Sequence, residues 1–173
     1  FRFLLSSGRM VCHKDTSIEL EQVKAKLDVL QSVDSRLEFY DAHSPNAMYS
    51  LQMGARGMSS ISGNFYPEIL VWMVNHATDP AMQEKVKWLQ SEISRVDPLI
   101  HVAYPMSAKY FLRKRGLPVR TISRATALEL TPQQKQTLDD IHNDFLHWCR
   151  QLEIQPVDTA LLSLPKVPLD PAI

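Results

Sequence analysis

The sequence predicts an α/β fold in which short parallel strands alternate with helices, followed by a region made of helices alone. Extended apolar segments alternate with amphipathic helical segments as far as Tyr66, which is the pattern of βαβ units with right-handed crossovers. From Pro67 onward, the apolar residues recur at helical spacing instead. Repeated prolines over residues 156–173 then predict an extended tail.

The first elements predicted are a strand, a helix and a second strand. Residues 9–14 read as the end of a buried strand, and Thr16 to Glu19 fit a capping box that begins a helix. One face of this helix carries the apolar residues Val23, Leu27 and Leu30. The chain then resumes an extended strand over residues 36–40.

A short helix and a third strand follow. Ser44-Pro45 opens the helix, which is expected to stop at Gly54 because glycine favours the end of a helix. Residues 58–62 then read as the third strand.

Two start signals stand out in the helical region. Asp79-Pro80 is expected to cap a helix that reaches about Val96. Thr131 provides an N-cap with proline at the first helical position and Gln134 at the third, which is a complete capping box. Between these helices, the basic run over residues 113–115 reads as a solvated last turn of a helix.

Composition argues for a small-molecule partner. The chain has 19 basic and 19 acidic residues and a net charge of zero, so nothing in it favours nucleic acid or an anionic membrane. No apolar run approaches the roughly 18 residues that span a bilayer. Cys12 and Cys149 form no CxxC pair and are expected to be reduced thiols, which favours the cytoplasm.

Lys14 is the residue with the clearest chemical potential. In βα folds, side chains at the carboxyl ends of strands face the site that the loops surround. A lysine desolvated there loses part of its proton affinity, and its neutral amine can attack a ketone to form a Schiff base. The nine residues around Lys14, taken alone, fit an ordinary solvated lysine better than a nucleophile.

A second candidate segment, residues 54–64, is rich in glycine and serine. Glycines carry no Cβ and reach positive φ, so such a loop can present amides and hydroxyls to a small anion. A tight connection with nothing bound is the alternative.

Together, these segments resemble the dihydrodipicolinate synthase and N-acetylneuraminate lyase family of pyruvate-dependent class I aldolases. Residues 12–16 resemble the family's Schiff-base lysine motif on the sixth barrel strand, and residues 37–44 resemble its seventh strand and loop. Residues 54–64 are similar to the glycine-serine-asparagine pattern of the eighth strand, and residues 104–117 to a later family helix. The resemblance covers about residues 3–153.

The resemblance implies the C-terminal portion of a (β/α)8 TIM barrel, about strands 6 to 8, followed by a helical region. It divides the chain into barrel units over residues 1–97, helices over 98–155 and the tail, which could lie against a neighbouring subunit. A whole barrel takes about 250 residues, so 173 residues that open as if inside a helix suggest a fragment. The family's tyrosine proton relay and carboxylate-binding pair would lie upstream, in the same molecule or on a partner chain.

The function implied is a lyase or aldolase in which Lys14 forms a Schiff base with pyruvate or a related 2-oxo acid, with an aldehyde-type second substrate. No cofactor and no metal is expected, nor any nucleic-acid or membrane partner, and the assembly would be a homo-oligomer, as a tetramer or dimer. The residues expected to bind substrate are Thr16, Ala42, Ser44, Gly57, Ser59, Ser60, Ile61 and Ser62.

Departures from the family pattern leave alternatives open. Cys12 and Ala42 stand where the family has glycine, and Ser44-Pro45 replaces the acidic residues that hold sugar hydroxyls in the sialic-acid lyases. A sugar-acid dehydratase on the same scaffold and a non-catalytic relative are therefore both possible. His13 and His43 could relay protons at the pocket mouth, or His13 could pack against a helix.

Overall fold

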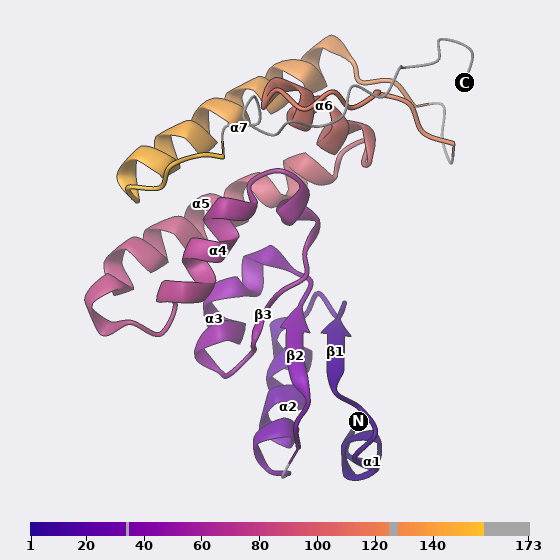
Figure 1. The fold of residues 1–173 in the computed structure, drawn as a ribbon, viewed down its shortest axis with the longest axis vertical. Coiled ribbons are helices and arrows are strands. Elements are labelled where there is room, and N and C mark those ends of the chain that lie inside the picture. The colour runs from indigo at the N-terminus through magenta and orange to yellow at the C-terminus, as the bar shows by residue number, and fades with distance from the viewer. Residues whose placement is uncertain (34, 125–127, 158–173) are drawn as a thin grey trace.

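Three parallel strands form the sheet of this protein, in the order β1-β2-β3. The computed structural model describes residues 1–33, 35–124 and 128–157, and the predicted tail beyond residue 157 lies outside this range. The strands point their carboxyl ends toward the helical part of the molecule, as Figure 1 shows. The carboxyl ends of the three strands therefore face the loops and helices that follow them.

The α/β part follows the predicted alternation. A short helix, α1, precedes the first strand, and α2 lies along the sheet (Figure 1). Its elements are α1 (Arg2–Ser6), β1 (Cys12–Asp15), α2 (Leu20–Gln31), β2 (Glu38–Asp41), the 3-10 turn η1 (Ser44–Asn46), α3 (Ala47–Gln52) and β3 (Gly57–Met58).

The remainder of the described chain is helical. Successive helices α4 and α5 pack beside α3, and α6 and α7 lie farther from the sheet (Figure 1). Its elements are η2 (Ile61–Asn64), α4 (Pro67–His76), η3 (Pro80–Met82), α5 (Gln83–His101), α6 (Met106–Lys114) and α7 (Pro132–Gln151). The boundary expected at residue 97 falls within α5, which continues beyond Pro98 to residue 101.

The buried apolar side chains form two separate clusters. The smaller one joins α1, α2 and the sheet, and includes Val23, Leu27 and Phe39. The larger one extends from α3 to α7, with Phe111 and Trp148 among its fully buried side chains. The larger cluster therefore joins α3 of the α/β part to the helical region, while the strands and α2 pack on the smaller one.

Two of the predicted element boundaries were wrong. The capping box at residues 16–19 does not form, since α2 begins at Leu20 and its N-cap, Glu19, makes no side-chain cap hydrogen bond. The backbone amide of Ser17 instead donates to the buried carboxylate of Asp15 at 2.7 Å. The third strand is Gly57–Met58 only, because the chain turns into η2 at Ile61.

Other local predictions are confirmed. The chain leaves α3 through Gly54 at a φ of +98°, a conformation that favours glycine. At α7 the complete capping box is present, with the Gln134 amide donating to the Thr131 hydroxyl and the Gln134 side chain accepting from the Thr131 amide. Among the described residues, no helix is long and apolar enough to cross a membrane.

The basic run at residues 113–115 differs from its prediction at one position. Arg113 and Lys114 are exposed, but the side chain of Arg115 is only 7% exposed and pairs with Glu68 of α4. Its guanidinium also donates to the Phe65 carbonyl at 2.8 Å and lies 4.9 Å from the centre of the Phe145 ring. Arg115 therefore ties α6 to α4 and α7, because it lies one residue beyond α6, where the chain turns inward.

Candidate functional site

Lys14 lies on the open face of the sheet. It is paired in register with Tyr40 of β2, and both side chains lie on the same face because paired residues of adjacent strands do. Lys14 is exposed, and its amine makes no hydrogen bond or ion pair with any residue in the described part of the chain. An amine in this setting is accessible to a small molecule.

Alternation along β1 decides which side chains share that face. Cys12 and Lys14 are exposed, while His13 and Asp15 point to the helix side. His13 packs between the rings of Phe1 and Phe39, with ring centres 5.2 and 5.3 Å away. The alternative in which His13 packs rather than lines the pocket is the one observed.

The loops after the three strands meet at the carboxyl edge of the sheet. The Ala42 amide donates to the Asp15 carbonyl at 2.9 Å, and the Ser59 amide donates to the Asp41 carbonyl at 2.8 Å. These bonds align the strand ends. The residues that directly follow the three strands therefore lie side by side, namely Thr16, Ala42 and Ser59. The structure brings these three expected substrate-binding residues to the end of β1 that carries Lys14.

Close packing accounts for Gly57 on β3. A Cβ at this position would lie 3.2 Å from the Tyr40 ring, closer than side chains normally pack. The Tyr40 hydroxyl donates to Glu38 at 2.8 Å, and Tyr40 is paired in register with Lys14 on one side and Gly57 on the other. The sequence pattern indicated the glycine, and the tyrosine explains it.

Ser44 and Ser62 lie in the interior rather than at the surface of the site. Their hydroxyl oxygens are 2.5 Å apart, and the Ser62 hydroxyl is 3.4 Å from a carboxylate oxygen of Asp97 on α5. Both serines are buried. Their hydroxyls join the loops after β2 and β3 to each other and to α5.

Ser60 and Ile61 lie between Ser59 at the carboxyl end of the sheet and the buried Ser62, and both are partly buried. The Ser60 hydroxyl is buried and has no hydrogen-bond partner among the described residues. A buried hydroxyl without a partner is uncommon in a folded protein, so it marks a position where a further polar group would be accommodated.

Two buried carboxylates behind the site escaped the sequence analysis. Asp15 and Asp41 are paired in register on β1 and β2, and both are almost completely buried. Lys26 of α2 donates to Asp15 at 2.6 Å, whereas one oxygen of Asp41 has no partner in the described residues. Strand alternation could have revealed them, because Asp15 follows Lys14 and must face the opposite way.

Their surroundings move the two pKa values in opposite directions. Burial raises the pKa of Asp15, but hydrogen bonds from Lys26 and Ser17 outweigh it and lower the pKa overall. Burial dominates at Asp41 and raises its pKa, because the hydrogen bond from the His43 amide compensates only in part. One charged pair and one carboxyl group whose pKa is raised by burial therefore lie behind the site.

Residues with metal-binding side chains do not gather in the described part of the chain. No group of three or more His, Cys, Asp or Glu side chains is placed to hold a metal ion there. Asp139 and Asp144 instead pair with Lys114 and Arg95, at 2.9 Å in each case.

Comparison with protein families gives the lineage of the chain. The sequence profile of the Dihydrodipicolinate synthetase family matches residues 2–144. The chain belongs to this family. No curated protein sequence matches it at a significant level.

Solved structures of this family share its fold. The prophage protein YagE from E. coli K12, described in complex with pyruvate, is 18% identical with a TM-score of 0.71, over 89% of this chain and 50% of YagE. Dihydrodipicolinate synthase from Aquifex aeolicus is 13% identical with a TM-score of 0.68, over 83% of this chain and 48% of that one. A chloride-inhibited synthase from Acinetobacter baumannii, complexed with pyruvate, is 19% identical with a TM-score of 0.60, over 82% and 45%.

These likenesses show a partial α/β fold of the TIM-barrel type. The chain covers between 45% and 50% of the length of these three family structures. A family member of this extent carries part of a barrel and the helices beside it.

Proposed function

We propose that this chain supplies the Schiff-base lysine of a class I lyase or aldolase acting on pyruvate or a related 2-oxo acid. The observation that carries the proposal is Lys14, an exposed amine without a partner in the described residues, at the carboxyl end of a parallel strand. Membership of the Dihydrodipicolinate synthetase family supports this chemistry in general.

In this proposal β1, β2 and β3 are the sixth, seventh and eighth strands of the barrel. Residues 1–97 then form the last barrel units, residues 98–155 the helical region, and the rest a tail. The parallel order β1-β2-β3 supports the strand correspondence, since successive strands of such a barrel are neighbours.

The chemistry begins with attack of the neutral Lys14 amine on the ketone carbon of the 2-oxo acid. Loss of water gives an iminium. In cleavage, the bond between the carbon next to the iminium and the carbon beyond it breaks, the iminium accepts the electron pair to become an enamine, and an aldehyde departs. The enamine then takes up a proton, and water hydrolyses the iminium to release the 2-oxo acid and Lys14. In condensation, the iminium loses a proton from the adjacent carbon, and the enamine attacks the carbonyl carbon of an aldehyde to form the new carbon–carbon bond. The same lysine therefore serves both directions.

The loops at the carboxyl edge would position the 2-oxo acid. Thr16, Ala42 and Ser59 lie at the level of Lys14, so their backbone or hydroxyl groups are suited to hold the substrate there. Gly57, Ser60 and Ile61 shape the adjoining wall. Ser44 and Ser62, whose hydroxyls are buried against each other, would act by holding the two loops in place.

The two thiols fit a reducing compartment. Cys12 is exposed and Cys149 is buried, and both are free. We place the protein in the cytoplasm on this basis, and we expect two or four copies to assemble as the family resemblance implies. Sedimentation of the intact protein would measure the number of copies.

The decisive experiment traps the Schiff base. The intact protein that contains this chain is incubated with pyruvate and borohydride, and its peptides are analysed by mass spectrometry. A reduced pyruvate adduct on the Lys14 peptide is expected, because borohydride reduces the iminium to a stable amine.

Two variants make the result specific. Lys14→Ala should lose the adduct without losing the fold, since this side chain is exposed and contacts no partner among the described residues. Lys85→Ala, which removes an equally exposed lysine of α5, should retain it. An unmodified Lys14 in folded protein would contradict the proposal and favour a non-catalytic relative. In a separate incubation with a sugar acid and without borohydride, release of the dehydrated acid instead of aldol cleavage products would identify a dehydratase.

A further inference from the structure

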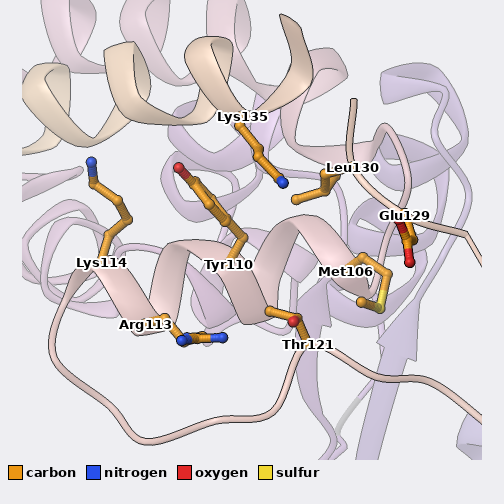
Figure 2. Close-up of a pocket in the computed structure, with 8 residues that line it drawn as sticks. All are labelled: Met106, Tyr110, Arg113, Lys114, Thr121, Glu129, Leu130 and Lys135. Carbon is orange, nitrogen blue, oxygen red and sulfur yellow. The ribbon is translucent and has the colours of Figure 1, made fainter. Parts of the chain in front are cut away.

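A second cavity lies between α6 and α7, away from Lys14. It has a volume of about 520 Å³, within the range of small-molecule sites. Figure 2 shows its lining, which comes from α6, from the start of α7 and from the segment that joins them. The lining residues are Met106, Tyr110, Arg113, Lys114, Thr121, Glu129, Leu130 and Lys135.

Four of these residues lie on one face of α6. Met106, Tyr110, Arg113 and Lys114 follow the spacing i, i+4, i+7 and i+8, which places them on a single stripe of a helix. Figure 2 shows the amine of Lys135 reaching from α7 toward the space beside Tyr110. Residues from both helices therefore converge on one cavity.

The charges of this lining do not balance. Three cations, Arg113, Lys114 and Lys135, stand against one carboxylate, Glu129. Lys114 is neutralised by Asp139 at 2.9 Å. In the described part of the chain, the side chains of Arg113 and Lys135 make neither a hydrogen bond nor an ion pair, although the protein as a whole carries no net charge.

Asp139 is fully engaged and cannot neutralise a further cation. It accepts from both Lys114 and the Tyr110 hydroxyl, the latter at 2.9 Å. Burial raises the pKa of Asp139, but these two bonds outweigh it and lower the pKa overall, so the carboxylate is charged at neutral pH. The cation excess of the cavity therefore lies with Arg113 and Lys135.

The cavity also has an apolar side. Met106 and Leu130 are 4% and 8% exposed, so both side chains belong to the protein interior and show only a small apolar surface to the cavity. A site with apolar side chains beside unpaired cations suits a ligand with a short hydrocarbon body and one anionic group. Inorganic phosphate would satisfy the cations but leave the apolar part uncovered.

We infer that the cavity between α6 and α7 is a binding site for a small organic carboxylate, separate from the Lys14 site. The carboxylate pairs with Lys135 and Arg113, and the hydrocarbon body lies against Met106 and Leu130. This inference does not depend on the proposed Schiff-base chemistry, because no residue of that site lines the cavity.

Hexanoate is the probe for this site, and the methyl resonance of Met106 is the reporter. Its assignment comes from its disappearance in Met106→Leu. Titration of the intact protein with hexanoate at constant ionic strength should shift this resonance in a saturable way. Hexanol, which lacks the charge, and inorganic phosphate, which lacks the apolar body, should each bind at least tenfold more weakly.

Variants connect the binding to the two cations. Arg113→Gln and Lys135→Gln should each weaken hexanoate binding several-fold, and the double variant should abolish it. Lys85→Gln with Arg150→Gln, which removes two exposed cations elsewhere, should leave it unchanged. Absence of a saturable Met106 shift, equal binding of phosphate, or hexanoate binding that survives the double variant would each overturn the inference. Pyruvate trapping on Lys14 is measured separately and is expected to be the same in all these variants.

Discussion

Among single residues, Lys14 and its neighbour Asp15 lie on opposite faces of the sheet at the candidate site. One side chain is exposed on the open face of the sheet, and the next is buried and bound to Lys26. The sequence located Lys14 at a strand end because lysine after an apolar run is conspicuous. Strand alternation places Asp15 on the face opposite to Lys14, but the sequence does not show that Lys26 covers it there.

Asp41 should make stability fall as pH rises above the acid range. Its pKa is raised from 3.8 in the folded protein, so the native state keeps a proton that the unfolded state has already lost. The stabilisation is fully present below 3.8 and is lost as pH rises through the raised pKa. Asp41→Asn should therefore increase the free energy of unfolding at pH 7 by on the order of 1 kcal/mol, and by nothing at pH 3.

Urea unfolding of both proteins at a series of pH values checks this. Asp28→Asn, which changes an exposed aspartate of α2, serves as the matched control and should have little effect. The lowered pKa of Asp15 makes stability depend on pH in the opposite direction. Its contribution to stability is present above 3.8 and is lost as pH falls. A destabilised Asp41→Asn protein at pH 7 would show that the ionised carboxylate is favourable where it lies.

Among the elements, the quality of the start signals decided what could be predicted. Thr131 begins α7 as expected because its capping groups have no competing partner. The similar signal at residues 16–19 failed, since α2 begins only at Leu20, and Ser17 within that stretch donates its amide and hydroxyl to the buried Asp15 carboxylate. Likewise, the third strand was predicted too long, since an apolar and hydroxyl-rich stretch fits both a strand and the 3-10 turn η2.

Removing the cap of α7 should destabilise the protein moderately. Thr131→Ala leaves the Gln134 amide without its hydroxyl acceptor and should lower the free energy of unfolding by about 1 kcal/mol. Thr131→Ser should keep nearly the full free energy of unfolding, because the serine hydroxyl offers the same acceptor. Thr78→Ala, at an exposed position outside any helix, is the control. Equal stability of Thr131→Ala and the parent chain in urea unfolding would mean that tertiary packing alone fixes the start of α7.

For the whole molecule, the larger apolar cluster joins α3 to the helices, and Arg115 ties α6 to α4 and α7 beside it. The α/β order and the helical region were both predictable from apolar periodicity. The inward turn of Arg115 was not, because an arginine in a basic run gives no sign that its partner lies on a helix 47 residues earlier. The burial of Ser44 and Ser62 was equally hidden, since it depends on Asp97 of α5.

Replacing Arg115 should be severe. Arg115→Ala leaves Glu68 buried without its charge partner and removes the hydrogen bond to the Phe65 carbonyl, so the loss of stability should be about 3–5 kcal/mol. Arg115→Lys should recover only part of it, because an ammonium group cannot reproduce the planar guanidinium contacts. Arg113→Ala, two residues away and exposed, should have little effect. Thermal unfolding followed by circular dichroism would separate these cases, and similar midpoints for Arg115→Ala and Arg113→Ala would contradict the role given to Arg115.

The division of the apolar interior into two clusters has a further consequence for Lys14. Its strand rests on the smaller cluster, built from α1, α2 and the sheet, whereas the larger cluster holds α3 through α7 together. Local opening free energies follow the amount of buried apolar contact, so we expect the unit around β1 to open at a lower free energy than the helices. Fluctuations at the Lys14 amine are therefore expected to be separate from global unfolding.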